Sequence, residues 1–282
     1  MCAHSCFRRL RALTKDDFRA IRRRESELPP ESLKLSLLIP ARESSRRLEG
    51  SLREAHAFLS ERFGGDFEII LIPNPPPDAG PDASVRACEA LAGGFARVKV
   101  VPHLSPPMSP GKGAALRAGF LASAGRIIFF TDADLPYDLG FIDAALAKMD
   151  QGFDLVSANR RIPGGRPGGR RRLGLIFNGA VRLLFPVGTR DTQAGFKAMS
   201  RRLAAVAFSR GLCPGFFFDL EIFLSWLGMG WAHAEVPVAQ RRETGESTIC
   251  IPRESVLAVY WLIRIRAGHA NGRYAERAPC RA

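Results

Sequence analysis

The stretch Ile127-Ile128-Phe129-Phe130-Thr131-Asp132-Ala133-Asp134 decides the predicted fold, because a short apolar run leads directly into two carboxylates. A run of this length that ends at polar residues is typical of a buried strand. In an extended backbone, residues two apart point the same way, so Asp132 and Asp134 can face one cation. A solvated turn that caps a helix is the alternative interpretation of the same residues.

Similar short apolar runs recur along the chain on both sides of this segment. We expect strands at 35–39, 68–72, 98–101, 127–130 and 153–157, with helices at 48–63 and 111–124. Strands that alternate with helices predict an α/β fold with a mainly parallel sheet flanked by helices. Ligands bind at the carboxyl ends of such strands. The loops that follow Ile72, Val101, Phe130 and Ser157 are therefore expected at one edge.

The composition limits the classes of protein to consider. The 282 residues are 46% apolar, which is enough for a substantial core and excludes wholesale disorder. The net charge is +13, from 41 Lys and Arg against 28 Asp and Glu. Such an excess favours anionic partners, among them phosphate-bearing substrates and anionic membrane surfaces, unless it only reflects a genome that uses much arginine. No motif for specific nucleic-acid recognition is present.

The chain is predicted to have three parts: a basic helical extension at 1–30, one α/β domain at 31–268 and a tail at 269–282. Its six cysteines lack zinc or redox-motif spacing. The first 30 residues have no secretory apolar run, and no stretch of 18 apolar residues occurs. We therefore expect a cytoplasmic protein. A peripheral position on the inner face of the membrane is the accompanying hypothesis.

Two further segments have the composition of a phosphate site. Gly111-Lys112-Gly113 precedes a predicted helix, where free N–H groups and a lysine suit a phosphate, although a plain capped loop is the alternative. Arg160 and Arg161 follow a predicted strand, and Arg170 lies in a Gly-rich and Arg-rich stretch beyond them. Guanidinium groups pair with phosphate through two hydrogen bonds. A solvated charge run is the alternative for the arginines.

With these motifs in order, the chain from about Leu35 to Arg266 resembles the family-2 glycosyltransferases, and among them the dolichyl- and polyprenyl-phosphate sugar synthases. The segments that carry the resemblance are Ile39-Pro40-Ala41, Gly111-Lys112-Gly113-Ala114-Ala115, Thr131-Asp132-Ala133-Asp134-Leu135, Ala158-Asn159-Arg160-Arg161, Asp191-Thr192-Gln193-Ala194-Gly195-Phe196-Lys197, Phe218-Asp219-Leu220-Glu221 and Glu235-Val236-Pro237-Val238. Each segment alone is weak, and their common order carries the resemblance.

The resemblance implies a GT-A fold and a metal-dependent, inverting transfer of a hexosyl group from a nucleotide-sugar to a polyprenyl or dolichyl phosphate. It implies Mg²⁺ or Mn²⁺ bound by Asp132 and Asp134. The implied catalytic residues are Asp132, Asp134, Asp191 and Arg160. The implied donor-binding and phosphate-binding residues are Pro40, Ala41, Glu43, Lys112, Asp132, Ala133 and Asp134. The implied acceptor-binding residues are Arg160, Arg161, Arg170, Gln193 and Lys197.

Two segments depart from the family pattern. Arg42-Glu43-Ser44 replaces the usual Tyr-Asn-Glu, and the proline-rich 73–78 replaces an Asp-Asp-Gly-Ser-type turn. Both normally contact the nucleoside, so the nucleotide stays open. Two alternatives follow: a family-2 enzyme with a soluble or glycan hydroxyl acceptor, or a non-catalytic protein of this fold. A hydroxyl acceptor needs a carboxylate base, for which the candidates are Asp191, Asp219 and Glu221.

Overall fold

The computed structural model describes residues 30–41, 46–74, 81–102, 111–161, 179–189, 191–239 and 251–274. These residues form two compact units. The first unit comprises the chain up to Asp134 together with Phe208–Phe218. The second comprises Leu135–Ala207 and the chain from Asp219 onward.

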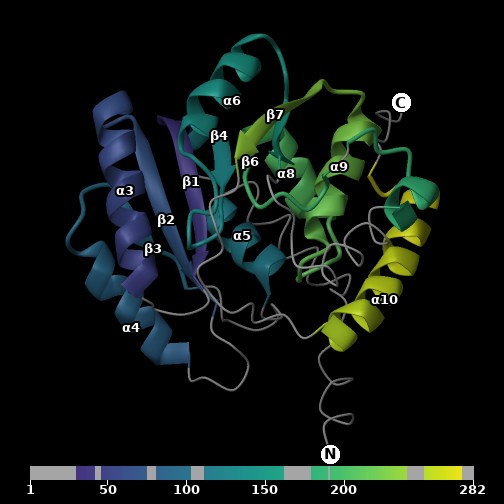
Figure 1. The fold of residues 1–282 in the computed structure, drawn as a ribbon, viewed down its shortest axis with the longest axis horizontal. Coiled ribbons are helices and arrows are strands. Elements are labelled where there is room, and N and C mark those ends of the chain that lie inside the picture. The colour runs from purple at the N-terminus through teal and green to yellow at the C-terminus, as the bar shows by residue number, and fades with distance from the viewer. Residues whose placement is uncertain are drawn as a thin grey trace, which may run out of the picture. The chain divides into compact units, whose positions relative to one another are not determined.

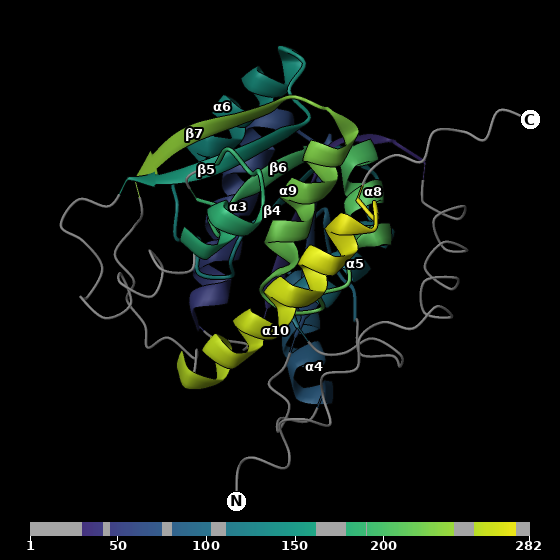
Figure 2. The ribbon, with the colours of Figure 1, turned by 90° about the vertical axis from the view of Figure 1, so that its right-hand side faces the viewer.

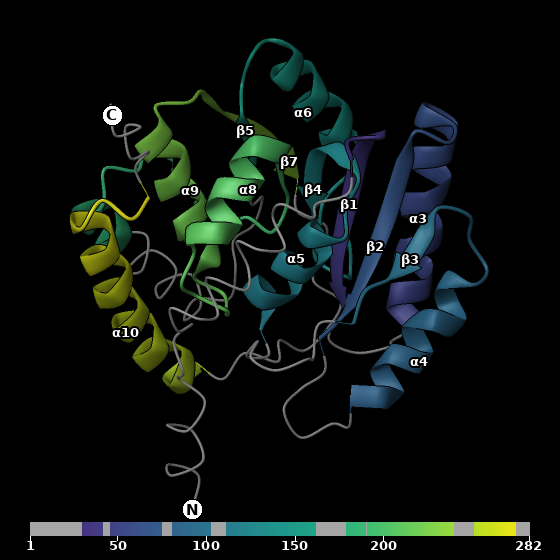
Figure 3. The ribbon, with the colours of Figure 1, turned by 180° about the vertical axis from the view of Figure 1, so that it is seen from behind.

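The first unit is a parallel sheet with helices on both faces. Its strands are β1 (Leu33–Ala41), β2 (Phe67–Pro73), β3 (Val98–Val100) and β4 (Gly125–Phe130), in the order β3-β2-β1-β4. The helices α3 (Arg46–Phe63) and α4 (Pro81–Ala92) cover one face, and α5 (Lys112–Leu121) covers the other (Figures 1 and 3). The arrangement confirms the predicted parallel strands in this part of the chain.

The register of these strands brings the predicted loops of the first unit to one edge. Ala41 pairs with Pro73, and Leu38 pairs with Phe130, so β1, β2 and β4 all end on the same side. Strands β1 and β2 read as almost continuous apolar runs because both faces of a helix-covered parallel sheet are buried. A carboxylate, Glu68, is also buried here, where it accepts hydrogen bonds and pairs with Lys99 at 2.7 Å.

The second unit has a mixed sheet of β5 (Leu155–Arg161), β6 (Lys197–Ser200) and β7 (His233–Ala239), in the order β6-β5-β7. Strands β5 and β7 are parallel, and β5 and β6 are antiparallel. The helices are α6 (Gly140–Asp150), α8 (Arg201–Arg210), α9 (Phe218–Met229) and α10 (Ile251–Ala270) (Figure 2). None of the helices in the described part of the chain is both long and apolar enough to span a bilayer.

Two parts of the structure extend beyond the predicted boundaries. Strand β5 continues to Arg161 rather than ending at Ser157, so Arg160 lies within the strand. The predicted boundary at 268 falls inside α10. Tyr274 is buried and donates a hydrogen bond to Glu221 at 2.7 Å, so the second unit extends at least that far. The pattern of apolar residues could not show either extension, because the end of β5 is polar and the last turn of α10 has no large apolar residue.

His233 predicts a measurable dependence of stability on pH. The ring bonds Ser157 at 2.9 Å and contacts Phe223 and Trp226 of α9. Burial lowers the pKa of His233 to about 4, against an opposing effect of Glu235. An unfolded histidine has a pKa of about 6.5, so the unfolded chain binds more protons between these values.

The free energy of unfolding should therefore fall as the pH drops from about 6.5 toward 4, by up to about 3 kcal/mol from this residue. Urea unfolding of the wild type and of His233→Asn at several pH values measures the effect. The variant should be less stable at pH 7 but lose less stability on acidification. Equal pH slopes for the two proteins would contradict the assignment.

Candidate active site

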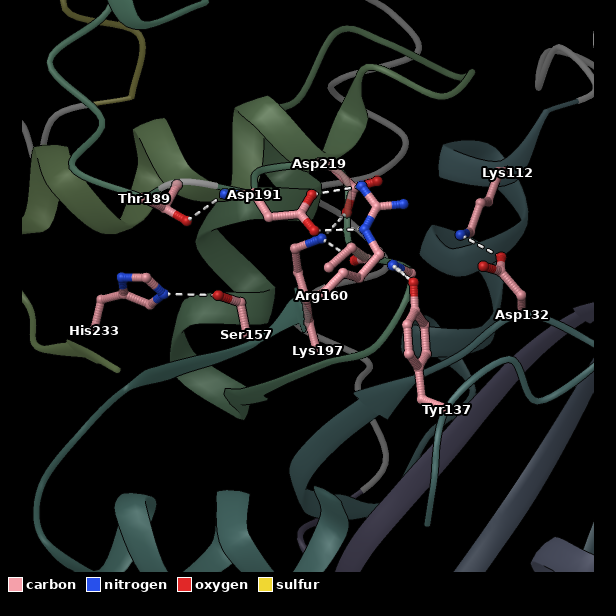
Figure 4. A network of polar contacts seen from close by, with 12 residues as sticks. Lys112, Asp132, Tyr137, Ser157, Arg160, Thr189, Asp191, Lys197, Asp219 and His233 are labelled. Atoms are coloured by element: carbon pink, nitrogen blue, oxygen red, sulfur yellow. Dashed lines mark hydrogen bonds and ion pairs between the residues drawn. The ribbon is translucent and has the colours of Figure 1, made fainter. Parts of the chain in front are cut away.

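The carboxyl edge of the first sheet holds a lysine–carboxylate pair. Asp132 follows β4, and Lys112 is the first residue of α5. The Lys112 Nζ atom lies 2.6 Å from Asp132 Oδ1 (Figure 4). The same ammonium lies over the rings of Phe130 and Phe218, at 5.8 and 6.0 Å from their centroids. The edge predicted for ligands therefore carries a partly exposed carboxylate that pairs with a lysine ammonium.

Glycines allow the start of α5 to approach the segment 213–218 closely. A Cβ atom on Gly111 would lie 2.3 Å from the Pro214 carbonyl oxygen, and one on Gly113 would lie 2.8 Å from the Cys213 carbonyl oxygen. No other residue fits at either position without a shift of the backbone. The Ala114 N–H group donates to the Pro214 oxygen at 2.9 Å. At least one N–H group that was predicted to be available for phosphate is thus already used.

Asp134 does not lie in the extended segment that the sequence predicted. Ala133 and Asp134 form a turn, and the next residue, Leu135, has a positive φ of 42°. A positive φ is uncommon for a residue other than glycine, and here Leu135 is buried. The extended backbone predicted for residues 132–134 is therefore absent, and strand geometry does not make Asp132 and Asp134 point the same way. Asp134 is exposed.

The second unit holds a tight arginine–carboxylate pair. Arg160 Nε lies 2.5 Å from Asp191 Oδ2, and Arg160 Nη2 lies 2.6 Å from Asp191 Oδ1 (Figure 4). Both side chains are mostly buried. Two parallel bonds of this kind fix the guanidinium plane as well as the distance. The structure therefore brings together two residues predicted to be catalytic, and it gives both carboxylate oxygens of Asp191 a cationic partner.

Sequence reasoning missed the residues behind this pair. The Glu235 carboxylate accepts a hydrogen bond from Asn159 Nδ2 at 2.7 Å and another from the Thr189 hydroxyl. The Thr189 Oγ1 atom in turn accepts from the Asp191 N–H group at 3.3 Å. Glu235 thus connects β7 and β5 to the Arg160–Asp191 pair. A charged residue within an apolar strand was the available signal, but Glu235 was noted only as part of a family motif.

Lys197 lies in the interior of the second unit. Its side chain is 0% exposed, and its Nζ atom lies 2.5 Å from Asp219 Oδ1, a side chain that is 4% exposed. The ammonium also donates to the Ala194 carbonyl oxygen at 2.6 Å. Glu221, two residues beyond Asp219 on α9, is also buried and accepts a hydrogen bond from Tyr274. Lys197 was predicted to contact an acceptor, and in the structure its ammonium is buried and paired with Asp219.

Two neighbouring side chains have unpaired polar atoms. The Gln193 Nε2 and Thr192 Oγ1 atoms are buried and have no hydrogen-bond partner among the described residues. A buried donor left without a partner costs roughly 1–3 kcal/mol, so native proteins rarely keep one unless a ligand, an ion or water completes it. Gln193 was one of the residues predicted to bind the acceptor.

The remaining predicted residues divide into those described and those outside the described ranges. Pro40 and Ala41 end β1, where the Ala41 carbonyl accepts from the Asn74 N–H group at 2.7 Å. Glu43, Arg170 and the side chain of Arg161 lie outside the described residues. Within the described ranges, no cluster of three or more His, Cys, Asp or Glu could bind a metal. Asp132 and Asp134 thus fit a Mg²⁺ or Mn²⁺ site only where substrate phosphates complete it.

Comparisons with known proteins agree with the predicted family. Residues 36–208, more than half of the chain, match the family Glycosyl transferase family 2. Glycosyltransferase AglD of Haloferax volcanii is 26% identical over 88% of this chain, which spans only 40% of that protein's length. The dolichyl-phosphate beta-glucosyltransferase of Saccharomyces cerevisiae is 25% identical and covers 89% of this chain and 79% of its own. The polyprenol monophosphomannose synthase of Mycolicibacterium smegmatis is 30% identical, and the match covers 69% of this chain and 77% of that protein.

Solved structures agree on the fold. Glucosyl-3-phosphoglycerate synthase from Mycobacterium tuberculosis, in complex with phosphoglyceric acid, has a TM-score of 0.62 at 19% identity, covering 90% of this chain and 84% of its own. The same synthase with Mn²⁺, uridine-diphosphate-glucose and phosphoglyceric acid has a TM-score of 0.60 at 20% identity. The match covers 94% of this chain and 86% of that chain. At these identities the likeness concerns the fold.

Proposed function

Because the chain belongs to glycosyl transferase family 2 and has the GT-A fold, we propose that it moves a hexosyl group from a nucleotide-sugar to a polyprenyl or dolichyl phosphate. The transfer inverts the configuration at the anomeric carbon and depends on a divalent cation. Similarity to the yeast glucosyltransferase and the mycobacterial mannose synthase supports this acceptor class. The proposal leaves the donor nucleotide and the hexose open.

The state of three carboxylates favours a phosphate acceptor over a hydroxyl. A hydroxyl must lose its proton to a base, whereas a lipid phosphate is already an anion at neutral pH. The three candidate bases are Asp191, Asp219 and Glu221. Asp191 is bonded through both oxygens to Arg160, Asp219 pairs with buried Lys197, and Glu221 accepts from Tyr274. Each of these carboxylates is therefore already engaged by a donor of the protein and is poorly placed to accept a proton from a substrate hydroxyl. This pairing of all three candidate bases carries the proposal.

On the donor side, Asp132 and Asp134 would hold Mg²⁺ or Mn²⁺ together with the donor diphosphate. The ion would neutralise the leaving diphosphate. Lys112 then has two roles in succession. Before the donor binds, it pairs with Asp132, and afterwards it can turn its ammonium to a diphosphate oxygen. This exchange keeps the Asp132 carboxylate paired in both states, which avoids an unpaired charge at the edge of the sheet.

On the acceptor side, Arg160 would bind the lipid phosphate while Asp191 fixes the guanidinium in place. The buried, unpaired Nε2 atom of Gln193 would complete its hydrogen bonding on the same acceptor. Catalysis on an acceptor that is already ionised consists mainly of positioning and of stabilising the leaving group. The sequence candidates Arg161 and Arg170 stay part of this proposal.

The connection through Thr189 makes Glu235 a positioning residue for Arg160. Glu235→Gln removes a charge and replaces one acceptor oxygen by a donor, which opposes the hydrogen bond from either Asn159 or Thr189. The KM for polyprenyl phosphate should rise by roughly three- to tenfold, because a less well oriented Arg160 should lose about 1 kcal/mol of binding free energy for the acceptor. The KM for the nucleotide-sugar should stay the same, as initial rates with each substrate varied in turn would show.

A matched control is Glu68→Gln in the first unit, since Glu68 is also a buried carboxylate that accepts several hydrogen bonds. It should lower the melting temperature without a selective change in either KM. An equal rise of the acceptor KM in both variants would mean that general destabilisation, not positioning of Arg160, causes the effect.

The experiment that tests the proposed function is a screen of nucleotide-sugars with and without a polyprenyl phosphate. We expect release of the nucleoside diphosphate to depend on the lipid phosphate for at least one donor. Transfer to glycan or soluble hydroxyls in its absence would favour the alternative acceptor class. Binding of a nucleotide-sugar with no transfer to any acceptor would favour a non-catalytic protein of this fold.

A further inference from the structure

We propose that the exposed face of α10, together with the turn at residues 179–184, is a docking surface for an anionic lipid bilayer. The inference rests on the proposed function in one respect: a lipid acceptor requires access to a membrane. It concerns a surface that no sequence motif identified. Two independent features carry it, namely apolar exposure and the distribution of charge.

Apolar side chains are exposed on both elements. Val259 and Ile263 are 60% and 65% exposed, and they lie four residues apart, on one face of α10. Leu183 is 87% exposed on the adjacent helical turn. Phe185 packs against His269, with ring centroids 6.2 Å apart, which places this turn beside the C-terminal end of α10.

The opposite face of α10 is apolar as well. Trp261, Leu262 and Ile265 are buried in the second unit. The exposed strip of Val259 and Ile263 therefore lies outside the core of the unit, and an exposed apolar strip of this kind marks an interaction surface. All the large apolar side chains exposed on the described chain belong to this surface: Leu183, Leu184, Val259 and Ile263.

The charge on the surface has one sign. Arg182, Arg264, Arg266 and Arg273 are exposed around the apolar residues. The ranges 179–189 and 257–274 contain no Asp or Glu. Long cationic side chains that flank an apolar strip are typical of a helix that lies in a membrane interface, where they reach the lipid phosphates. A protein partner with a mixed surface would not select for the complete absence of acids, so an anionic bilayer is the occupant that fits.

Sedimentation with vesicles of phosphatidylglycerol and phosphatidylcholine, free of polyprenyl phosphate, tests this surface without turnover. The full chain should bind, and Val259→Asp/Ile263→Asp should bind at least tenfold more weakly. The control is Ala57→Asp/Ala90→Asp, which adds the same charge at exposed positions of α3 and α4. It should bind like the wild type. Arg264→Gln/Arg266→Gln should weaken binding at low salt and have little effect at high salt, where charge attraction is screened.

Several results would overturn the proposal. The first is that the wild type does not sediment with the vesicles. The second is that Val259→Asp/Ile263→Asp binds them as strongly as the wild type. The third is that Ala57→Asp/Ala90→Asp loses as much binding as Val259→Asp/Ile263→Asp. A wild-type dimer that becomes monomeric in the Asp variant would assign the surface to a second copy of the chain. Transfer to a short, water-soluble polyprenyl phosphate separates the two proposals. Val259→Asp/Ile263→Asp should still transfer the hexosyl group to this soluble acceptor. A wild-type protein that does not transfer to it would contradict only the proposed function.

Discussion

Asp134→Asn should lower turnover by roughly a hundred- to a thousandfold, which is the effect of removing one group that stabilises developing charge. The substitution keeps the shape of the side chain and removes its charge. Asp134 is exposed, so the melting temperature should hardly change. The measurement is the steady-state rate of nucleoside diphosphate release, with thermal melting beside it.

Asp150→Asn is the matched control, since Asp150 is an exposed acid at the end of α6 in the second unit. It should turn over like the wild type. Chelator-treated wild type should lose activity to a similar extent as Asp134→Asn and regain it with Mg²⁺ or Mn²⁺. Substantial metal-independent turnover in both would mean that the two carboxylates only form a turn.

Lys197→Met should destabilise the second unit by about 3–5 kcal/mol, because it leaves the buried Asp219 carboxylate without its cation. Replacing both partners, as in Lys197→Met/Asp219→Leu, should restore most of that loss, since a buried ion pair often exchanges for apolar side chains at little cost. Urea unfolding followed by circular dichroism measures both differences.

The same pair of variants separates a structural lysine from one that binds the acceptor. If the folded double variant keeps the wild-type KM for polyprenyl phosphate, Lys197 acts only within the interior. A double variant that is stable yet shows a greatly raised KM would return Lys197 to the acceptor site. A single variant as stable as the wild type would contradict the buried pairing itself.

The parallel sheet was predictable because its strands are apolar on both faces. Runs such as Ile69–Ile72 and Ile127–Phe130 have the length and composition of buried strands, and the structure contains a strand at each. The ends were less predictable. Arg160 lies inside β5 because hydrogen bonding to β7 continues to Arg161, and a pattern of apolar residues cannot show pairing that polar residues make.

The candidate site was predictable by residue type but not by partner. Sequence order identified Asp132, Lys112, Arg160 and Asp191, yet spacing could not show that they pair with each other in two ion pairs. Lys197 shows the limit most clearly. A lysine is normally expected at the surface, and only the fold reveals that Asp219 lies close enough to pair with Lys197 in the interior.

The central claim is that the turn with Asp132 and Asp134 holds a divalent cation together with the donor diphosphate. Electron paramagnetic resonance of free Mn²⁺ measures the binding directly, with and without each nucleoside diphosphate sugar. We predict weak binding alone, at least tenfold tighter binding with the donor, and no such gain in Asp132→Asn/Asp134→Asn at the same concentrations. Donor-enhanced Mn²⁺ binding of equal strength in the double variant would contradict the claim.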